Sequence, residues 1–505
     1  MSVMGFQSGQ QLINTLDGIQ EDLVYLLPEF ILVVGILFLL IFDLIFNDKK
    51  IIGLTAISFV TLVFGVAWLL FSFPAEIQPI QLMNGLIQYS AQTALLKLIL
   101  MVSVLAILFM ATRSETLRNL FFRSSEIPIA VMGLLLGVFL MSMSIHWLMV
   151  YISIELVSIS SYLMVGLSPG KRNAEAGLKY LLYGAAASAV MLFGMSWLYG
   201  LTGTLHFYSD SFLAGIQAAD PLLLSAAFVL LLAGLLFKLG AFPMHTWAPD
   251  VYEAAPTPVV TLFAIVPKIA ALFLIWQISN IGAGLEVGCE KWVAALAIGG
   301  MVLGNFGAIW QRNAKRMLAY SSIAHAAFLL SVLLLGALAY QVLFFYVMVY
   351  ALMTIAAFFL IQIFEQRLNA VKFESFHGLG KAFPYLSILL LVVMLALIGL
   401  PPTAGFNAKF YLFAGLWNTY ESSGQEAVLW VLISGVANTV VALFYYLKIP
   451  YLLFFKNTCI EINTERAAYV KRDCLFGTLI VIPLLFLFFR SDALVDLLNN
   501  VNFTF

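Results

Sequence analysis

Seven ionisable side chains lie inside stretches of sequence that are otherwise almost wholly apolar. A charged group at mid-span in a membrane costs about +2.5 to +3.5 kcal/mol, a cost that packing alone gives no reason to bear. Such groups commonly face a protein interior or a water-filled cavity, and they mark ion or proton paths. The seven are Lys97, Lys179, Lys238, Lys268 and Lys409, the carboxylate Glu155 and the imidazole of His325.

Two of the lysines stand beside predicted helix breaks. Lys238 precedes Phe242-Pro243 in LLAGLLFKLGAFPMHTWAPD, and Lys409 follows Pro401-Pro402 in LIGLPPTAGFNAKFYLF. Proline lacks the N–H group and clashes with the preceding turn, so a spanning helix breaks or kinks at each site. A break frees backbone groups and leaves room for water, and both features suit an ion or proton path.

Lysine suits proton transfer because its pKa falls when the amine is desolvated or lies near another cation, and rises near a carboxylate. Glu155 is the one carboxylate placed well inside an expected span, and it needs a counter-charge. We expect it to lie in the protein interior and to face Lys179, Lys238 or both. Lys268 follows a proline within its span, and the same argument applies to it.

Other residues have simpler interpretations. Lys97 lies near a helix end, where a long stem reaches the interface, so we expect no functional role for it. His325 is either a core histidine satisfied by Ser321 and Ser322 or a proton relay, and both readings stay open. Asp250 is expected near the surface, where solvation or helix capping accounts for it.

The composition indicates an all-α polytopic membrane protein. Hydrophobic residues make up 63% of the chain and charged residues 10%, and the mean hydropathy is +1.01. Apolar windows of roughly 20 residues place about fourteen transmembrane helices, two of them at or next to the breaks. No linker or soluble domain is predicted between them.

The basic residues of the connections support this count. They fall in odd-numbered connections, with Lys291 and Arg490 as the exceptions. By the positive-inside rule the odd connections are cytoplasmic and both termini lie on the opposite face. Lys49 and Lys315 are therefore expected to be accessible from the cytoplasm.

Several classes of protein are not favoured. Cys289, Cys459 and Cys474 lack the spacing of a haem, iron–sulfur, zinc or disulfide site. There is no basic stripe with interleaved aromatic residues to suggest nucleic-acid binding, and a cleaved signal peptide is not expected.

The residues around the breaks resemble a known family. FKLGAFPMHTWAPDVYEAAPTPV with Lys268 beyond it, RMLAYSSIAHAAF and GLPPTAGFNAKFYLF are similar to the antiporter-like membrane subunits of respiratory complex I, the proton-pumping NADH:quinone oxidoreductase. The resemblance extends from the first span to the last. Lys409, where M-type subunits are expected to carry glutamate, and AEAGLKYLLYGAAAS favour the N-type subunit, called chain 2.

The resemblance implies two inverted five-helix repeats, each containing one broken helix. It divides the chain into 1–126 (three N-terminal helices), 127–280 (first repeat), 291–450 (second repeat) and 451–505 (a loop and the last helix). It also implies proton translocation by Glu155, Lys179, Lys238, Lys268, His325 and Lys409, and gives Lys97 no role.

The function expected from these observations is proton transfer across the membrane, coupled to NADH-to-quinone electron transfer in other subunits. The chain itself is expected to hold no cofactor or redox centre. Its expected partners are other membrane-arm subunits, including other antiporter-like ones, within a bilayer that is most simply the bacterial inner membrane. The alternatives are a subunit of an Mrp-type cation/proton antiporter and an assembly scaffold whose buried charges only fix helix packing.

Overall fold

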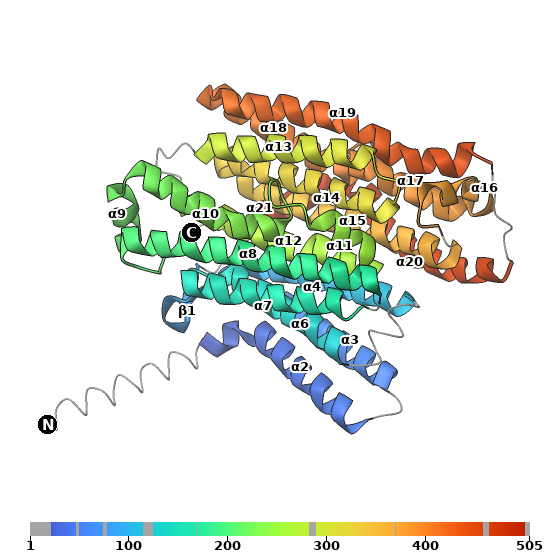
Figure 1. The fold of residues 1–505 in the computed structure, drawn as a ribbon, viewed down its shortest axis with the longest axis horizontal. Helices are drawn as coiled ribbons and strands as arrows, with labels where there is room; N and C mark the ends of the chain where they lie inside the picture. The colour runs from blue at the N-terminus through green and yellow to red at the C-terminus, as the bar shows by residue number, and fades with distance from the viewer. Residues whose placement is uncertain are drawn as a thin grey trace.

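The computed structural model describes residues 22–46, 50–73, 78–114, 125–168, 170–281, 289–368, 370–457 and 464–499. Long helices run side by side through most of this part of the chain (Figure 1). The helices that are each long and apolar enough to span a membrane are α2 (Leu27–Ile45), α3 (Lys50–Phe71), α4 (Ala91–Arg113), α6 (Glu126–Met143), α7 (Trp147–Gly166), α8 (Lys171–Thr202), α10 (Pro221–Leu239), α12 (Thr257–Ile281), α13 (Cys289–Ile309), α14 (Ala314–Ser331), α15 (Ala339–Leu368) and α19 (Glu426–Phe455).

Two further spans complete the bundle in the described residues. α20 (Thr464–Phe489) qualifies together with α21 (Ser491–Asn499), which is bent by 80° from it, and α17 (Pro384–Ile398) is a shorter apolar helix. The predicted all-α membrane fold with about fourteen spans is confirmed. The 20-residue helix α18 (Ala404–Ser423) follows α17 after the second break. Short elements fill the connections: the hairpin β1 (Ile80–Leu82) and β2 (Ile87–Tyr89), the helices α9 (Asp210–Ala218), α11 (Ala248–Ala254) and α16 (Leu379–Ala382), and the 3-10 turns η1 (Met83–Gly85), η2 (Val332–Leu338) and η3 (Phe373–Phe376).

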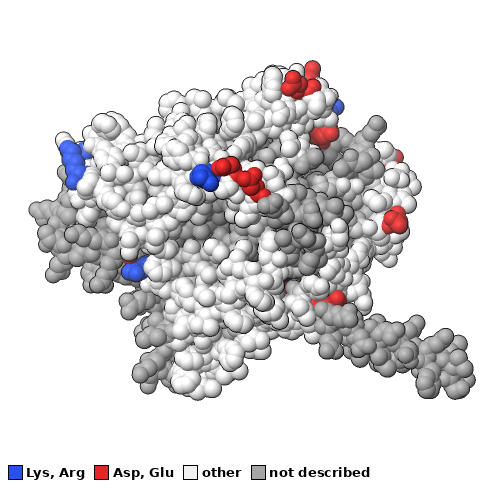
Figure 2. Space-filling model, turned by 180° about the vertical axis from the view of Figure 1, so that it is seen from behind, with Lys and Arg blue, Asp and Glu red and all other residues white. Residues whose placement is uncertain are grey.

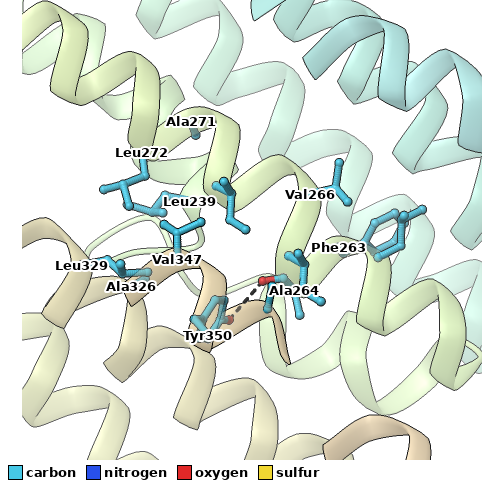
Figure 3. Close-up of a cluster of buried hydrophobic side chains, with 14 of the residues drawn as sticks. Leu239, Phe263, Ala264, Val266, Ala271, Leu272, Ala326, Leu329, Val347 and Tyr350 are labelled. Carbon is cyan, nitrogen blue, oxygen red and sulfur yellow. Dashed lines mark hydrogen bonds between the residues drawn. The ribbon is translucent and has the colours of Figure 1, made fainter. Parts of the chain in front are cut away.

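Helix α12 is the centre of the bundle, since its most apolar 18-residue window is 100% buried. Figure 3 shows its residues Phe263, Ala264 and Leu272 in a cluster with Leu329 of α14 and Val347 of α15. Lipid tails are as apolar as these side chains, so the close van der Waals fit, more than transfer from water, favours the contact.

The outer helices present apolar side chains to the surroundings. In α2 and in α19, only 28% of the residues of the most apolar 18-residue stretch are buried. Figure 2 shows one face of the molecule on which charged groups are few, with Lys and Arg mainly to the left and Asp and Glu mainly to the right. A small group of both signs also lies near the middle of this face (Figure 2), and most of the surface around it is uncharged, as expected of a multi-pass membrane protein.

Both predicted helix breaks are present, and they are built alike. α10 ends at Gly240 (φ 62°) and α17 ends at Gly399 (φ 88°), each in the left-handed conformation that glycine adopts at little cost. Proline-containing segments follow, and the chain becomes helical again in α11 and α18. Each break therefore exposes helix-terminal carbonyl groups within the bundle.

The ends of the helices that carry basic connections gather at one end of the bundle, which we call the basic end. Arg113 at the end of α4 lies 3.5 Å from Asp473 of α20, and Lys315 at the start of α14 lies 3.0 Å from Glu365 of α15. The Lys315 side chain is only 7% exposed and paired, so it is less accessible than expected, while the side of the membrane on which it lies stays a prediction. Lys49 lies outside the described residues.

The opposite end is closed by the hairpin that sequence reasoning missed. Ile87 of β2 forms a bridge with Ser144 after α6, and the Met83 N–H donates to the Asp22 carboxylate over 2.7 Å. Asn499 of α21 bonds to Gln341 at the start of α15 at 2.9 Å. The first and last described helical segments thus lie at this same end.

Candidate functional site

Glu155 and Lys238 come together between α7 and α10. Lys238, in the last turn of α10, is 3% exposed, and its Nζ has no hydrogen-bond partner among the described residues. The amine lies 5.3 Å from the ring centroid of Tyr162. Glu155 acts on Lys238 electrostatically without forming an ion pair of 4 Å or less in the described chain, and its Oε1 is buried without a partner. The expectation that Glu155 faces Lys238 is met, although Glu155 is only partly buried.

Lys179 does not join this pair. Its Nζ lies 2.8 Å from Glu175 Oε1 and 3.3 Å from Asp250 Oδ2, at the basic end of the bundle. The expected pairing of Lys179 with Glu155 is therefore wrong. Sequence spacing could not exclude it, because Asp250 reaches Lys179 only after the α10 break turns α11 back toward α8.

Asp250 is held from two sides. Lys179 of α8 contacts one carboxylate oxygen, and Arg316 Nη1 of α14 donates to the other over 2.8 Å. Arg316 also bonds Glu253, one turn further along α11, at 2.8 Å. These residues, with Arg172 and Glu175, line a hollow of about 270 Å³. Asp250 is thus a bridge between helices rather than a simple solvated or capping residue.

Lys268 projects from the central helix α12 toward α14. Its Nζ donates to Ser322 Oγ and to the Ser322 carbonyl at 3.3 Å. The side chain is 2% exposed and passes the first break, where a Cβ on Gly240 would lie 3.4 Å from its Cε and Nζ. Ser322 Oγ is also 3.5 Å from Tyr252 OH of α11.

Lys409 stands at the second break in a comparable way. It is 5% exposed and donates to the Ile398 carbonyl over 2.7 Å, which satisfies a carbonyl freed at the end of α17. A Cβ on Gly399 would lie 2.8 Å from Lys409 Cδ, so the break glycine leaves space for the lysine stem. The amine is 4.8 Å from the ring centroid of Phe328.

His325 lies on α14 between these two lysines, and both act on it electrostatically. Its Nδ1 is 3.0 Å from Tyr346 OH of α15, and its Nε2 is 3.4 Å from Tyr446 OH of α19. Ser321 contacts Tyr446, and Ser322 contacts Lys268. The ring is thus satisfied by tyrosines and not by the nearby serines, and this contact set fits a structural role and a relay role alike.

Lys97 is the clearest error of the sequence analysis. It is fully buried, with 0% exposure, and its Nζ lies 2.6 Å from Glu29 Oε1 of α2. The rings of Tyr89 and Phe139 lie 5.2 and 5.7 Å from the amine. The hairpin after α3 covers this end of α4, so the lysine has no interface to reach.

Sequence reasoning also missed Glu29, Tyr346 and Tyr446. Glu29 had a signal, because a carboxylate in the first turn of an apolar helix needs either solvent or a partner. The two tyrosines had none, since nothing in the sequence separates them from the many other aromatic residues. The described residues hold no group of three or more His, Cys, Asp or Glu placed to bind a metal ion.

Comparison with known proteins places this geometry in a family. The family model described as "NADH:quinone oxidoreductase/Mrp antiporter, TM" matches residues 144–437, the region that carries Glu155, both breaks and all three lysines beside them. The chain belongs to this family.

Family members of similar length support the assignment. The NADH-quinone oxidoreductase subunit N of Chlorobium chlorochromatii is 30% identical over 95% of this chain and 95% of its own. The corresponding subunit N of Pelagibacter ubique is 31% identical over 95% of this chain and 99% of its own.

Solved structures share the fold of this chain. A chain of respiratory complex I from Thermus thermophilus, solved with bound aureothin, has a TM-score of 0.76 at 27% identity and covers 94% of this chain and 100% of its own. A chain of the Mrp complex from Dietzia has a TM-score of 0.78 at 17% identity, covering 95% of this chain and 97% of its own. The second likeness shows the fold alone.

Proposed function

We propose that this chain is the N-type, proton-translocating membrane subunit of an NADH:quinone oxidoreductase. Electron transfer from NADH to quinone takes place in other subunits, and this chain holds no redox centre of its own. The chain is a bacterial inner-membrane protein with both termini outside the cytoplasm, and other membrane-arm subunits cover parts of its apolar sides. Its path is built from two repeats, residues 127–280 and 291–450.

One observation carries the proposal. Lys238, Lys268 and Lys409 are each 5% exposed or less, and none has a carboxylate within ion-pair distance among the described residues. A structural lysine in a membrane protein is normally paired, because an unpaired buried charge is costly. An amine without a counter-ion at a helix break is instead suited to gaining and losing a proton.

The proposed path joins these buried groups in the order of the helices that carry them. Protons enter at the basic end near Lys179 and Asp250 and reach the Glu155–Lys238 pair. From Lys238 the order is Lys268, His325 and Lys409, which crosses from the first repeat to the second. Movement of Glu155 relative to Lys238 changes the field on the amine, and this links the charge state of the lysine to the rest of the complex.

The test is proton translocation by the reconstituted complex. Glu155→Ala and Lys238→Ala are expected to remove most of the protons moved per NADH oxidised, while the complex assembles. Lys171→Ala, an exposed lysine at the start of α8, is the matched control and is expected to pump normally. Normal pumping by both Glu155→Ala and Lys238→Ala would refute the path and would support the scaffold alternative.

An Mrp-type antiporter subunit is the second candidate, because the family description names both activities. The two curated relatives that match 95% of this chain are N subunits of the oxidoreductase, which favours the first. Purification of the native complex distinguishes them: co-purifying NADH dehydrogenase subunits support the oxidoreductase, and a complex of antiporter subunits without NADH oxidation supports the alternative.

A further inference from the structure

The hydroxyl groups around His325 form a connected chain through three helices of the second half of the molecule. Ser321 and His325 lie on α14, Tyr346 on α15 and Tyr446 on α19. Tyr446 OH contacts Ser321 Oγ and lies 3.4 Å from His325 Nε2, while Tyr346 OH lies 3.0 Å from His325 Nδ1. All four residues are 4% exposed or less.

A neutral imidazole has one N–H donor and one acceptor nitrogen. Because a tyrosine hydroxyl faces each nitrogen, one of them accepts from the ring and the other donates to it. The two tautomers of His325 then correspond to the two directions of hydrogen bonding along one chain. The chain is bonded in either state, so neither tautomer leaves a buried polar atom without a partner.

We propose that Tyr346 and Tyr446 are proton-relay residues that pass protons through both nitrogens of His325, an inference that rests on the path proposed above. Tyr446 gives its hydroxyl proton to His325 Nε2 and regains one from Ser321. His325 gives the proton on Nδ1 to Tyr346, and Tyr346 releases its own proton onward. One proton enters at Ser321, one leaves at Tyr346, and no residue of the chain keeps a charge.

Both lysines lie near this chain. Ser321 is next to Ser322, which accepts from Lys268, and Lys409 acts on His325 electrostatically. Neither lysine nitrogen bonds directly to the four-residue chain in the described residues, so water is the carrier required at each end. The long Tyr446–His325 contact makes the movement of the Tyr446 hydroxyl from Ser321 to His325 the controlling step.

Tyr350 provides a matched control. Its ring centroid lies 5.4 Å from that of His325, against 6.1 Å for Tyr346, and it is equally buried. Its hydroxyl, however, donates to the Ala264 carbonyl over 3.0 Å (Figure 3). The Tyr350 hydroxyl also lies near Ser322 and Thr354, but it has no hydrogen bond to His325 among the described residues, so it stands outside the chain that runs from Ser321 to Tyr346.

The experiment compares Tyr346→Phe, Tyr446→Phe and Tyr350→Phe in the reconstituted complex. The first two are expected to lose at least about half of the protons moved per NADH, with assembly unchanged, since positioned proton transfer commonly contributes about 10²–10⁴ in rate. Tyr350→Phe is expected to retain the wild-type ratio. Wild-type pumping by both relay variants overturns the proposal, as does an equal loss in Tyr350→Phe, which would indicate packing.

A second measurement covers the case in which a phenylalanine variant fails to assemble. A ring-fluorinated tyrosine at position 446 keeps the shape and the hydroxyl but makes the hydroxyl more acidic. The relay predicts a changed pumping rate, and an unchanged rate overturns it. Failure of the underlying path is distinguished by the lysines: if Lys268→Arg and Lys409→Arg support full pumping, the lysine path itself is wrong, whatever the tyrosine variants do.

Discussion

Lys97 Nζ of α4 lies 2.6 Å from Glu29 Oε1 of α2, and both side chains are almost completely inaccessible. The pair joins the first spanning helix to the third, beside the ring of Phe139 from α6. It lies apart from the breaks and from Lys238, Lys268 and Lys409, and its amine has a carboxylate within ion-pair distance, which those three lack among the described residues. On the proposal above, this contrast separates a lysine that fixes helices from lysines that exchange protons.

Removal of one member of this pair is expected to destabilise the protein. Lys97→Met leaves the Glu29 carboxylate buried without a counter-charge, a loss of about 3–5 kcal/mol for a buried pair. The measurement is the amount of subunit in the membrane and the thermal stability of the purified complex. Lys171→Met, at an exposed position, is expected to have no effect.

The double variant Lys97→Met/Glu29→Gln is compared with the single variant Lys97→Met. It removes both charges together and is expected to recover most of the lost stability, with near-normal pumping. A double variant that assembles well but pumps poorly would show that Lys97 takes part in proton transfer, contrary to the role assigned here.

The sequence predicted helix positions and breaks better than it predicted contacts between side chains. Apolar windows and prolines act locally, so the spans and the breaks at Pro243 and Pro401-Pro402 could be placed without tertiary information. The contacts of Lys97 with Glu29 and of Lys179 with Asp250 could not, because each partner lies on a helix that only the folded bundle brings close. The hairpin around Met83 and Asn84 was missed although its two strands pair with each other; its bridge from Ile87 to Ser144 forms only in the folded bundle.

Sidedness of the bundle gives an independent prediction. Single cysteines at Lys171 and at Asp210, in a background without the native cysteines, are expected to react from opposite sides of the membrane, since both positions are exposed and begin α8 and α9 at opposite ends. The basic end is expected to be cytoplasmic. The measurement is labelling by a membrane-impermeant maleimide in cells and in inverted vesicles. Reaction of both sites from the same side would contradict the arrangement of α8.

We predict that Lys409 keeps its position only if residue 399 is glycine. In Gly399→Ala the new Cβ would lie 2.8 Å from Lys409 Cδ, so the stem must move and its bond to the Ile398 carbonyl weakens. Gly424→Ala is the matched control, because Gly424 also ends a helix with φ 67° but has nothing within 4 Å of an added Cβ. Both variants carry the backbone cost of about 1–2 kcal/mol for a left-handed residue, and only Gly399→Ala is expected to reduce pumping. Equal pumping by the two would show that the position of Lys409 does not matter.

Arginine substitution separates proton carriers from fixed charges. Each carrier must change its protonation state, and arginine keeps its proton at all relevant pH values. Lys268→Arg and Lys409→Arg are therefore expected to lose much of their pumping although the positive charge remains, with Lys171→Arg as an exposed control that pumps normally. The guanidinium group is also larger, and the space beside Gly240 and Gly399 is tight, so assembly is measured in parallel.

The ratio of proton translocation to NADH oxidation in the assembled arginine variants decides whether the two lysines carry protons or act as fixed charges. Assembled Lys268→Arg and Lys409→Arg complexes with low proton translocation and continued NADH oxidation indicate that the two amines must release a proton. If both variants pump at the wild-type ratio, the lysines act as fixed charges that hold Ser322 and the Ile398 carbonyl in place. The proton would then have to cross between the two breaks through other groups.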